Sequence, residues 1–387
     1  MSALPVDAVS TGVAPEDGPF RVMVVDDSAV IRGMVSRWIE ADPALTVVGS
    51  ASNGRMAVQQ LDRLDPEIVV LDIEMPELDG LSALPQILAA LPDVKVIMAS
   101  TLTLRNADIS MKALAAGAAD YIPKPSSARE MQGTSEFQRD LLAKIKALGN
   151  ARRLHPGARA RKPKLSRAEL PAKPRGRVPL CGKGPIVLRP ASKQPPRVLT
   201  IGSSTGGPQA LFRLFGFLKN RVRLPILITQ HMPATFTTIL AEHLKRIAGA
   251  PCREAVNGEP VVAGTIYIAP GDWHMTVESD ANQRLIRLNQ APPENFCRPA
   301  VDPMLRSLAR AYGPNVLSLI LTGMGHDGLN GGRAVAEAGG TVMAQDEATS
   351  VVWGMPGAVA TGGLCSAVLP IDEIGPTLER MTSGSQP

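Results

Sequence analysis

The feature that most constrains this chain is a regular alternation of short apolar segments with amphipathic segments over residues 20–150. The apolar segments are rich in Val and Ile and have the length of strands, whereas the segments between them have helical periodicity. The series begins RVMVVD, SAVIRGMVSRWIE, LTVVGS, GRMAVQQLDRL, EIVVLD, and it ends with a helix near residues 137–148. This alternation predicts an α/β domain with a five-stranded, doubly wound parallel sheet. Its functional groups should lie at the carboxyl ends of the strands.

Polar side chains stand where several of these strands end. Asp26 and Asp27 close the first strand, Asp72 the third and Ser100 the fourth, while Lys124 follows the fifth. Taken singly, such a residue is more often a solvated side chain in a loop. Three neighbouring carboxylates repel one another unless a cation lies between them, and carboxylate oxygens suit Mg²⁺. A carboxylate beside such an ion can attack a phosphoryl donor, so this set predicts a phosphorylated aspartate.

The same residues lie within motifs of a known family. VDDS at 25–28, LDIEMPELDG at 71–80, AST at 99–101 and YIPKP at 121–125 resemble the receiver domains of two-component response regulators, over residues 21–145. The resemblance implies that Asp72 accepts the phosphoryl group. It implies a Mg²⁺ site formed by Asp26, Asp27, Asp72 and the backbone carbonyl of Glu74. It also implies that Lys124 pairs with the phosphate and that Ser100 and Tyr121 form a switch pair.

A basic, proline-rich stretch follows this domain. Residues 151–196 hold 13 Lys and Arg, one acidic residue and nine prolines, without a periodic apolar pattern. Because the whole chain has a net charge of +5, this local +12 leaves −7 on the remainder. We therefore expect two acidic domains joined by an extended basic linker over residues 146–196. The linker is a simple tether or a contact for an anionic surface, and its lack of aromatic residues disfavours nucleic acid as a partner.

The remaining bulk features predict a cytoplasmic protein. Residues 1–20 form a polar, loose leader without the basic and apolar regions of a secretory signal. No apolar run reaches the roughly 20 residues that a membrane span needs, so we expect no membrane insertion. The four cysteines show no paired short spacing, and we interpret them as reduced and incidental: Cys181, Cys252, Cys297 and Cys365.

The second half contains a serine at a predicted turn from strand to helix. RVLTIGSSTGGPQALFRLFGFL fits Gly-x-Ser-x-Gly with Ser204 at its centre, although such turns also bind phosphates and cofactors. The next strand, LPILITQHMP, ends at His231, a candidate general base, and LTGMGHDG supplies Asp327 to orient it and free N–H groups for an oxyanion. His274 and His326 remain alternative bases. The chain order Ser…His…Asp differs from that of the α/β-hydrolases and predicts a convergent triad.

These blocks resemble the catalytic domain of the chemotaxis protein-glutamate methylesterases, the CheB family, over residues 197–382. The matching segments are IGSSTGG at 201–207, TQHMPATFT at 229–237, YIAPGDWHM at 267–275, RPAVD at 298–302, LTGMGHDG at 321–328 and AQDEATSVVWGMPGAV at 344–359. The resemblance implies a doubly wound, mostly parallel α/β domain with Ser204 as nucleophile, His231 as base and Asp327 as its orienter. It places the backbone near Met324 in the oxyanion hole. Ser203, often alanine in the family, leaves open which serine attacks.

Together the two resemblances imply a regulated enzyme. Its reaction would be hydrolysis of γ-glutamyl methyl esters on chemoreceptors, with deamidation of glutamines there, and the esterase chemistry would need no cofactor. A chemotaxis histidine kinase would donate the phosphoryl group to Asp72, which would free a catalytic cleft covered by the receiver domain. A receiver-linked, non-catalytic scaffold that binds receptors is the alternative. A DNA-binding response regulator is disfavoured because the second half is acidic and rich in strands.

Overall fold

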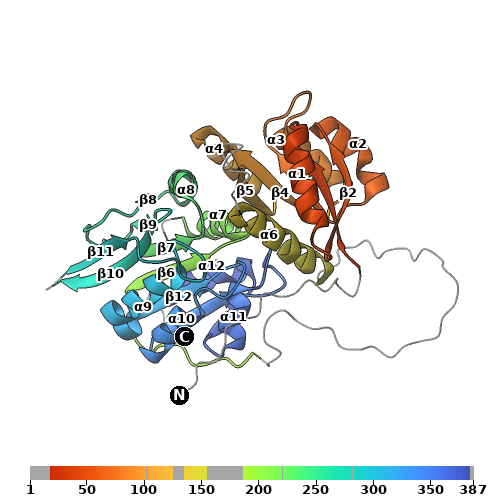
Figure 1. Cartoon of the computed structure of the whole chain (residues 1–387). Coiled ribbons are helices and arrows are strands. Elements are labelled where there is room, and N and C mark those ends of the chain that lie inside the picture. The colour runs from red at the N-terminus through yellow and green to blue at the C-terminus, as the bar shows by residue number, and fades with distance from the viewer. Residues whose placement is uncertain are drawn as a thin grey trace, which may run out of the picture. The chain divides into compact units, whose positions relative to one another are not determined.

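The computed structural model describes residues 18–101, 103–124, 135–154, 186–219, 221–280 and 283–383. These residues form two compact units, which we describe separately (Figure 1). One unit lies within Met1–Leu102 and Ala116–Leu154, and the other within Thr103–Ala115 and His155–Pro387. Nearly all of the predicted leader and most of the predicted linker lie outside the described residues.

The first sheet has five strands in the order β2-β1-β3-β4-β5. Every neighbouring pair is parallel, which confirms the predicted doubly wound domain. Both faces of the sheet are covered, as the complete burial of the apolar strand β3 shows. The strands are β1 Phe20–Val25, β2 Leu45–Ala51, β3 Ile68–Asp72, β4 Lys95–Thr101 and β5 Asp120–Lys124.

Helices follow these strands, and polar side chains fix where three of them begin. Ser28, Asn53 and Asp79 each accept a hydrogen bond from a backbone N–H in the first turn of the helix that follows. Such caps satisfy donors that have no partner inside the helix. The helices that follow these strands in the chain are α1 Ala29–Glu40, α2 Gly54–Leu64, α3 Gly80–Ala90, α4 Leu104–Ala115 and α6 Ser135–Leu154, of which α4 belongs to the second unit.

Helix α6 extends beyond the end that the sequence predicted near residue 148. Its last turn carries Arg152 and Arg153, and both form ion pairs with Glu67, at 3.1 and 2.7 Å. Glu67 is buried, with 2% of its surface exposed, and it also accepts the backbone N–H of Arg21. The two arginines therefore belong to a folded helix end, although the composition of this stretch suggested a linker from residue 146.

The second sheet has seven strands in the order β14-β13-β12-β6-β7-β9-β8. Every neighbouring pair is parallel, as predicted for this half. The order reverses at β6, which lies between β7 and β12, and ligands of such sheets bind at a reversal of this kind. The strands are β6 Val198–Ser203, β7 Ile226–Gln230, β8 Cys252–Glu254, β9 Ile266–Ile268, β12 Val316–Ile320, β13 Thr341–Gln345 and β14 Ala367–Leu369.

An antiparallel hairpin, which the sequence did not predict, adds to this unit. It consists of β10 His274–Asp280 and β11 Gln283–Asn289, and Figure 1 shows it projecting from the β8–β9 side. The Val277 N–H donates to Ser307 Oγ of helix α9 (Val301–Tyr312) at 3.0 Å, so the hairpin packs on that helix. The helices of this half are α7 Gly207–Leu218, α8 Ala234–Ala248, α9 Val301–Tyr312, α10 Leu329–Glu337, α11 Met355–Thr361 and α12 Ile371–Thr382, with a short 3₁₀ turn at Gly313–Asn315.

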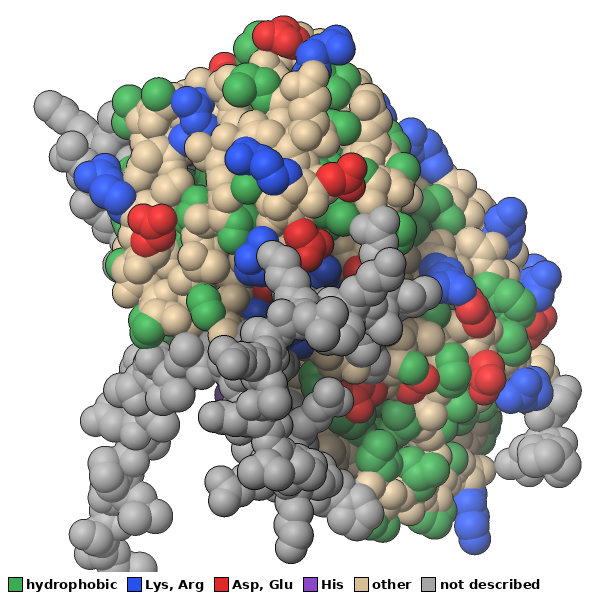
Figure 2. Space-filling view, turned by 90° about the vertical axis from the view of Figure 1, so that its right-hand side faces the viewer, with side chains coloured by type: hydrophobic (Ala, Val, Ile, Leu, Met, Phe, Trp, Pro, Cys, Tyr) green, Lys and Arg blue, Asp and Glu red, His purple; other side chains and the backbone are tan. Residues whose placement is uncertain are grey.

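The described part of the predicted linker, residues 186–196, contacts the second unit. Arg189 N donates to the carbonyl of Cys365 at 3.0 Å, and Ser192 N donates to Thr341 Oγ1 at 2.9 Å. On the face shown in Figure 2, Lys and Arg side chains of the described residues are interspersed with Asp and Glu. Among the described helices, none combines the length and the apolar character needed to cross a membrane.

Candidate active site and candidate phosphorylation site

The turn after β6 carries the predicted nucleophile, Ser204. Its backbone N–H donates to the carbonyl of Thr322 at 3.0 Å, and the N–H of His231 donates to the carbonyl of Ser203 at 3.1 Å. Gly206 has a φ of 77°, which a residue with a side chain rarely adopts. Three neighbouring strand ends thus fix this turn, and they place Ser204 at the reversal of strand order.

Gln230 clamps the two serines. Ser203 is fully buried, and its hydroxyl donates to Gln230 Oε1 at 2.6 Å. The amide of Gln230 donates in turn to the carbonyl of Ser204 at 2.9 Å. A Cβ at Gly207 would lie 2.0 Å from Gln230 Oε1, so this close approach requires glycine. Because the Ser203 hydroxyl is engaged inside the fold while Ser204 is partly exposed, the geometry favours Ser204 as the attacking serine.

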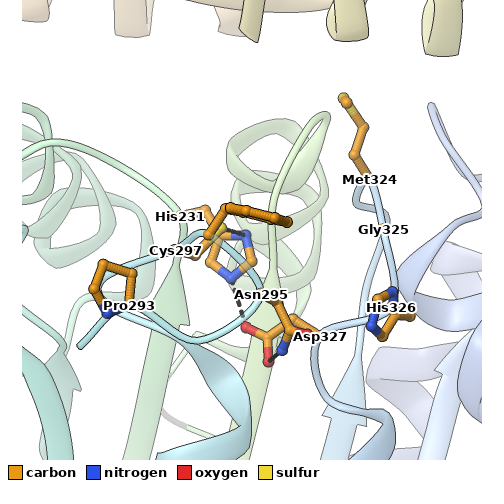
Figure 3. Close-up of a pocket in the computed structure, with 9 residues that line it drawn as sticks. His231, Pro293, Asn295, Cys297, Met324, Gly325, His326 and Asp327 are labelled. Carbon is orange, nitrogen blue, oxygen red and sulfur yellow. Dashed lines mark hydrogen bonds and ion pairs between the residues drawn. The ribbon is translucent and has the colours of Figure 1, made fainter. Parts of the chain in front are cut away.

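Two strand ends bring His231 and Asp327 together (Figure 3). Nε2 of His231 lies 2.8 Å from Oδ2 of Asp327, whose side chain is buried. The carboxylate also accepts the N–H of Val301 at 2.6 Å, the N–H of Asp302 at 3.0 Å and the Asn295 amide at 3.0 Å. Burial alone would raise the pKa of Asp327, but His231 and these N–H groups lower it below its ordinary value. Asp327 is therefore a fixed anion.

A second buried carboxylate, Asp302, lies behind this pair. Its Oδ1 accepts the N–H groups of Gly328 at 3.0 Å and Gly331 at 2.7 Å, and its Oδ2 accepts the Asn295 amide at 3.2 Å. Burial and the charge of Asp327 raise the pKa of Asp302. Asn295 therefore bridges two neighbouring carboxylates and holds their separation.

Cys297 lies against the other side of the His231 ring. Its Sγ is 3.4 Å from Nδ1, and the thiol is free. Burial lowers the pKa of His231, whereas the charge of Cys297 and the hydrogen bonds to Asp327 and Cys297 raise it, to about 10. This contact corrects the interpretation of Cys297 as an incidental residue. Another cysteine of this unit, Cys252, is buried at the start of β8.

A cavity of about 570 Å³ opens beside these groups. Gly323 directly precedes Met324, which lines this cavity. The carbonyl of Gly323 accepts the N–H groups of Gly354 at 3.1 Å and Met355 at 2.9 Å, and these hydrogen bonds fix the turn that carries Met324. The Met324 N–H has no acceptor within the part of the chain that the structure describes, so it is open to an oxyanion. The residues that line the cavity are His231, Pro293, Asn295, Phe296, Cys297, Met324, Gly325, His326 and Asp327.

The two alternative bases lie in different surroundings. His274 is buried, with its Nε2 3.2 Å from the carbonyl of Pro292 and its Nδ1 accepting the N–H of Ala300 at 3.2 Å. Both of its nitrogens are engaged in holding the loops of the fold. His326 is exposed at the cavity rim, and Figure 3 shows its ring turned away from His231. The geometry therefore favours His231 as the base.

The first unit contains the predicted acidic pocket. One oxygen each of Asp26, Asp27 and Asp72 lies within 4.8 Å of the others. Lys124 Nζ is 2.5 Å from Asp26 Oδ2 and 2.6 Å from Asp72 Oδ1. Burial raises the pKa of Asp72, Lys124 lowers it and Asp26 raises it further, to about 6. Three hard oxygen donors and an uncompensated negative charge fit a divalent cation such as Mg²⁺.

Of the other residues predicted for this pocket, Ser100 and Tyr121 lie in strands of the same sheet and Glu74 follows one. Ser100 is buried near the end of β4, one position after Ala99, which pairs with Asp72. Tyr121 is buried in β5, and its carbonyl accepts Lys144 Nζ at 2.8 Å. Glu74 is exposed two residues after β3. The roles implied for these three residues stay predictions.

Comparison with known proteins decides the family. Residues 199–378 match the family model of the CheB methylesterase, and residues 22–135 match that of the response regulator receiver domain. A protein-glutamate methylesterase/protein-glutamine glutaminase of Paramagnetospirillum magneticum is 56% identical over 375 residues, which cover 96% of this chain and 98% of that one. The protein of this name from Azospirillum brasilense is 58% identical over 380 residues, covering 96% and 95%. The chain belongs to the family of the protein-glutamate methylesterases/protein-glutamine glutaminases.

Solved structures of this methylesterase family resemble the two halves separately. The catalytic domain of Thermotoga maritima CheB is 39% identical, with a TM-score of 0.47, and the match covers 48% of this chain and 98% of that one. The response regulator domain of Thermotoga maritima CheB is 40% identical, with a TM-score of 0.31, and the match covers 34% and 97%.

Several residues of the methylesterase site escaped the sequence analysis. Gln230 was visible at the end of its strand, and Asp302 lies within the quoted RPAVD segment, but neither had an assigned role. Cys297 and Asn295 lie in an irregular segment without a period or a recognisable spacing. Their only signal was their position, Cys297 directly before RPAVD and Asn295 three residues before it.

Proposed function

We propose that this chain is a protein-glutamate methylesterase and protein-glutamine glutaminase regulated by phosphorylation, acting on chemoreceptors. The carrying observation is the hydrogen bond between His231 and Asp327 at the sheet edge that also holds Ser204. The relatives bear the names of enzymes, which speaks against a non-catalytic scaffold. Esterase and amidase reactions share one course, because both proceed by acyl transfer through a serine.

Acylation begins when Ser204 Oγ attacks the side-chain carbonyl of a glutamyl methyl ester. Because Nε2 of His231 is engaged with Asp327, Nδ1 takes the hydroxyl proton. The negative charge that develops on the carbonyl oxygen is stabilised by the Met324 N–H. His231 then gives its proton to the leaving oxygen, the carbon–oxygen bond breaks, and methanol departs from a glutamyl-serine ester.

Water completes the cycle. His231 Nδ1 removes a proton from a water molecule that attacks the acyl carbon, and the bond to Ser204 breaks with return of the proton to Oγ. The product is a glutamate side chain. From a glutamine substrate the leaving group is ammonia, and the second half of the reaction is the same. Asp327 acts throughout by orienting His231 and stabilising its cationic form.

The receiver domain supplies the regulation. An oxygen of Asp72 attacks the phosphorus of a phosphohistidine on a chemotaxis histidine kinase, the phosphorus–nitrogen bond breaks, and an aspartyl phosphate forms. Mg²⁺, held by Asp26, Asp27, Asp72 and the Glu74 carbonyl, would offset the added negative charge. As in the family, Lys124 would pair with the phosphate, and Ser100 with Tyr121 would transmit the change. The protein would work in the cytoplasm.

Methanol release from methylated chemoreceptor fragments tests this proposal. Wild-type protein should release methanol, and Ser204→Ala should reduce the rate by about 10⁴-fold or more, as loss of the nucleophile does in serine hydrolases. Ser203→Ala is the matched control and should keep the reaction, since its hydroxyl is engaged with Gln230. A fluorophosphonate should label Ser204 and stop the release. Undiminished release by Ser204→Ala would overturn the assignment.

A further inference from the structure

Two side chains engage the two nitrogens of the His231 ring (Figure 3). Asp327 Oδ2 lies 2.8 Å from Nε2, and Cys297 Sγ lies 3.4 Å from Nδ1. A carboxylate can only accept, so Nε2 carries the proton in this hydrogen bond. In a neutral imidazole Nδ1 is then the bare nitrogen, and its partner is the sulfur.

The sulfur therefore competes for the atom that catalysis needs. With Nε2 engaged, Nδ1 is the nitrogen of His231 that can take the proton of Ser204. A neutral Cys297 thiol donates its hydrogen to Nδ1. If that proton crosses, a thiolate and an imidazolium face each other. In both states the lone pair of Nδ1 is occupied.

We propose that Cys297 is a positioning residue that caps Nδ1 of His231 and sets the pH range in which this histidine serves as the base for Ser204. The inference rests on the proposed function, because it concerns the base of that reaction. Cys297 reaches the ring from the cavity wall, in a loop that its own backbone secures. Its N–H donates to the carbonyl of Glu294 at 2.9 Å, and the N–H of Glu294 donates back at 3.1 Å.

Besides Cys297, the titratable groups near His231 include Asp327, Asp302 and His326. Asp327 faces Nε2 and is held by N–H groups, so it stays an anion in any Cys297 variant. Asp302 lies behind it and is separated from the ring by Asp327 and Asn295. His326 lines the same cavity and is exposed. The raised pKa of His231, which owes part of its rise to the charge of Cys297, agrees with the geometric argument.

Two substitutions separate charge from hydrogen bonding. Cys297→Ala removes the cap and leaves Nδ1 open to Ser204. Cys297→Ser keeps a donor but cannot supply an anion at the pH values used, so the charge alone is lost. Both side chains are smaller than or similar to cysteine, and the hydrogen bonds of the loop backbone remain. Cys252→Ala is the matched control, because it removes a buried thiol of the same unit at β8.

The experiment measures kcat/KM for methanol release across pH, and the titration of His231 by NMR with labelled histidine. Because the negative charge of Cys297 raises the pKa of His231, the acid limb of kcat/KM in Cys297→Ala and Cys297→Ser should move to lower pH, by about one unit, together with the His231 titration. At pH values below both acid limbs, each pH unit of this shift should raise kcat/KM of the variant about tenfold over that of wild type. Cys252→Ala should leave both curves where they are.

Other outcomes overturn the inference. If both variants keep the wild-type acid limb and the wild-type His231 titration, Cys297 does not cap the base. If the Cys297 variants lost kcat at every pH while the His231 titration stayed at its wild-type position, the sulfur would serve only to fill space. The NMR titration needs no substrate, so its result decides the capping by itself. A wild-type chain that released no methanol at any pH would contradict the proposed function instead.

Discussion

Nε2 of His231 lies 2.8 Å from Oδ2 of Asp327, although the two residues are 96 positions apart in the chain. They follow β7 and β12, the two strands that flank β6. Because parallel strands end at one edge of a sheet, this order brings both side chains to the turn that carries Ser204. The sheet order thus assembles a candidate triad in the chain order Ser…His…Asp.

The first prediction concerns the orienting anion. Asp327→Asn should lower kcat for methanol release by about 10⁴-fold, because a neutral amide neither fixes the proton on Nε2 of His231 nor stabilises the imidazolium. His326→Gln is the control, since it removes the alternative base beside Asp327, and its rate should stay within about threefold of wild type. A large loss in His326→Gln with full activity in Asp327→Asn would reverse the two assignments.

The second prediction concerns the clamp on the serine turn. Gln230→Leu leaves the Ser203 hydroxyl and the Ser204 carbonyl without their partners, which should cost about 1–3 kcal/mol in the free energy of unfolding. A turn displaced by about 1 Å should also lower kcat by about 10²-fold. The double variant Ser203→Ala with Gln230→Leu should recover part of the stability, because fewer buried polar groups are left unpaired. Unchanged stability in Gln230→Leu would show that the clamp is dispensable.

The third prediction concerns the pH dependence of the acidic pocket. The pKa of Asp72 rises from an ordinary 3.8 to about 6 in the folded chain, so ionisation of this group opposes folding. The penalty is absent below pH 3.8, grows up to about pH 6 and stays constant above. Asp72→Asn should therefore stabilise the unit at pH 7, by at most about 3 kcal/mol at 1.36 kcal/mol per pKa unit, and by nothing near pH 3.5.

Hydrogen exchange of the β3 amides in the full chain measures this effect. Asp27→Asn is the control: its side chain is exposed, so the gain at pH 7 should be smaller. Mg²⁺ should slow the exchange of wild type more than that of Asp72→Asn, because the cation offsets the same repulsion. A destabilised Asp72→Asn at pH 7 would mean that its pairing with Lys124 outweighs the burial.

The fourth prediction concerns the end of α6. Glu67→Gln breaks a buried ion pair with Arg152 and Arg153, which should cost about 3–5 kcal/mol and speed amide exchange in the last turn of the helix. Burial raises the pKa of Glu67, but its hydrogen bonds and the charges of the two arginines lower it below the ordinary 4.5, so wild type should lose this stabilisation as the pH falls below that value. Glu77→Gln breaks an exposed pair with Arg55 and should change stability by less than about 1 kcal/mol.

Much of the fold could be predicted because its strands are buried on both faces. The apolar run that becomes β3 has no polar position that could face water, and its burial is complete. Ser204 and His231 were identifiable because each directly follows such a run, and Asp327 because it lies in the turn that follows β12. The position of a residue after a strand can be read from the local sequence. Because the strands are parallel, residues that follow neighbouring strands lie close together at one edge of the sheet.

Other features depend on contacts that a sequence does not display. Cys297 lies 66 positions from His231, in a segment without strand or helix periodicity, so nothing local indicates that the two side chains meet. The sequence analysis placed Arg152 and Arg153 in a basic linker, because nothing local indicates their partner Glu67, which lies some 85 positions earlier. Such long-range pairings are set by tertiary packing, which composition and periodicity do not encode.

The most direct test of the account is methanol release from methylated chemoreceptor fragments, with and without a small-molecule phosphodonor and Mg²⁺. Wild type should release methanol and should do so faster with the phosphodonor. Asp72→Asn should keep the basal rate without stimulation, and Ser204→Ala should release methanol about 10⁴-fold more slowly or less under either condition. Full stimulation of Asp72→Asn, or undiminished release by Ser204→Ala, would contradict the account.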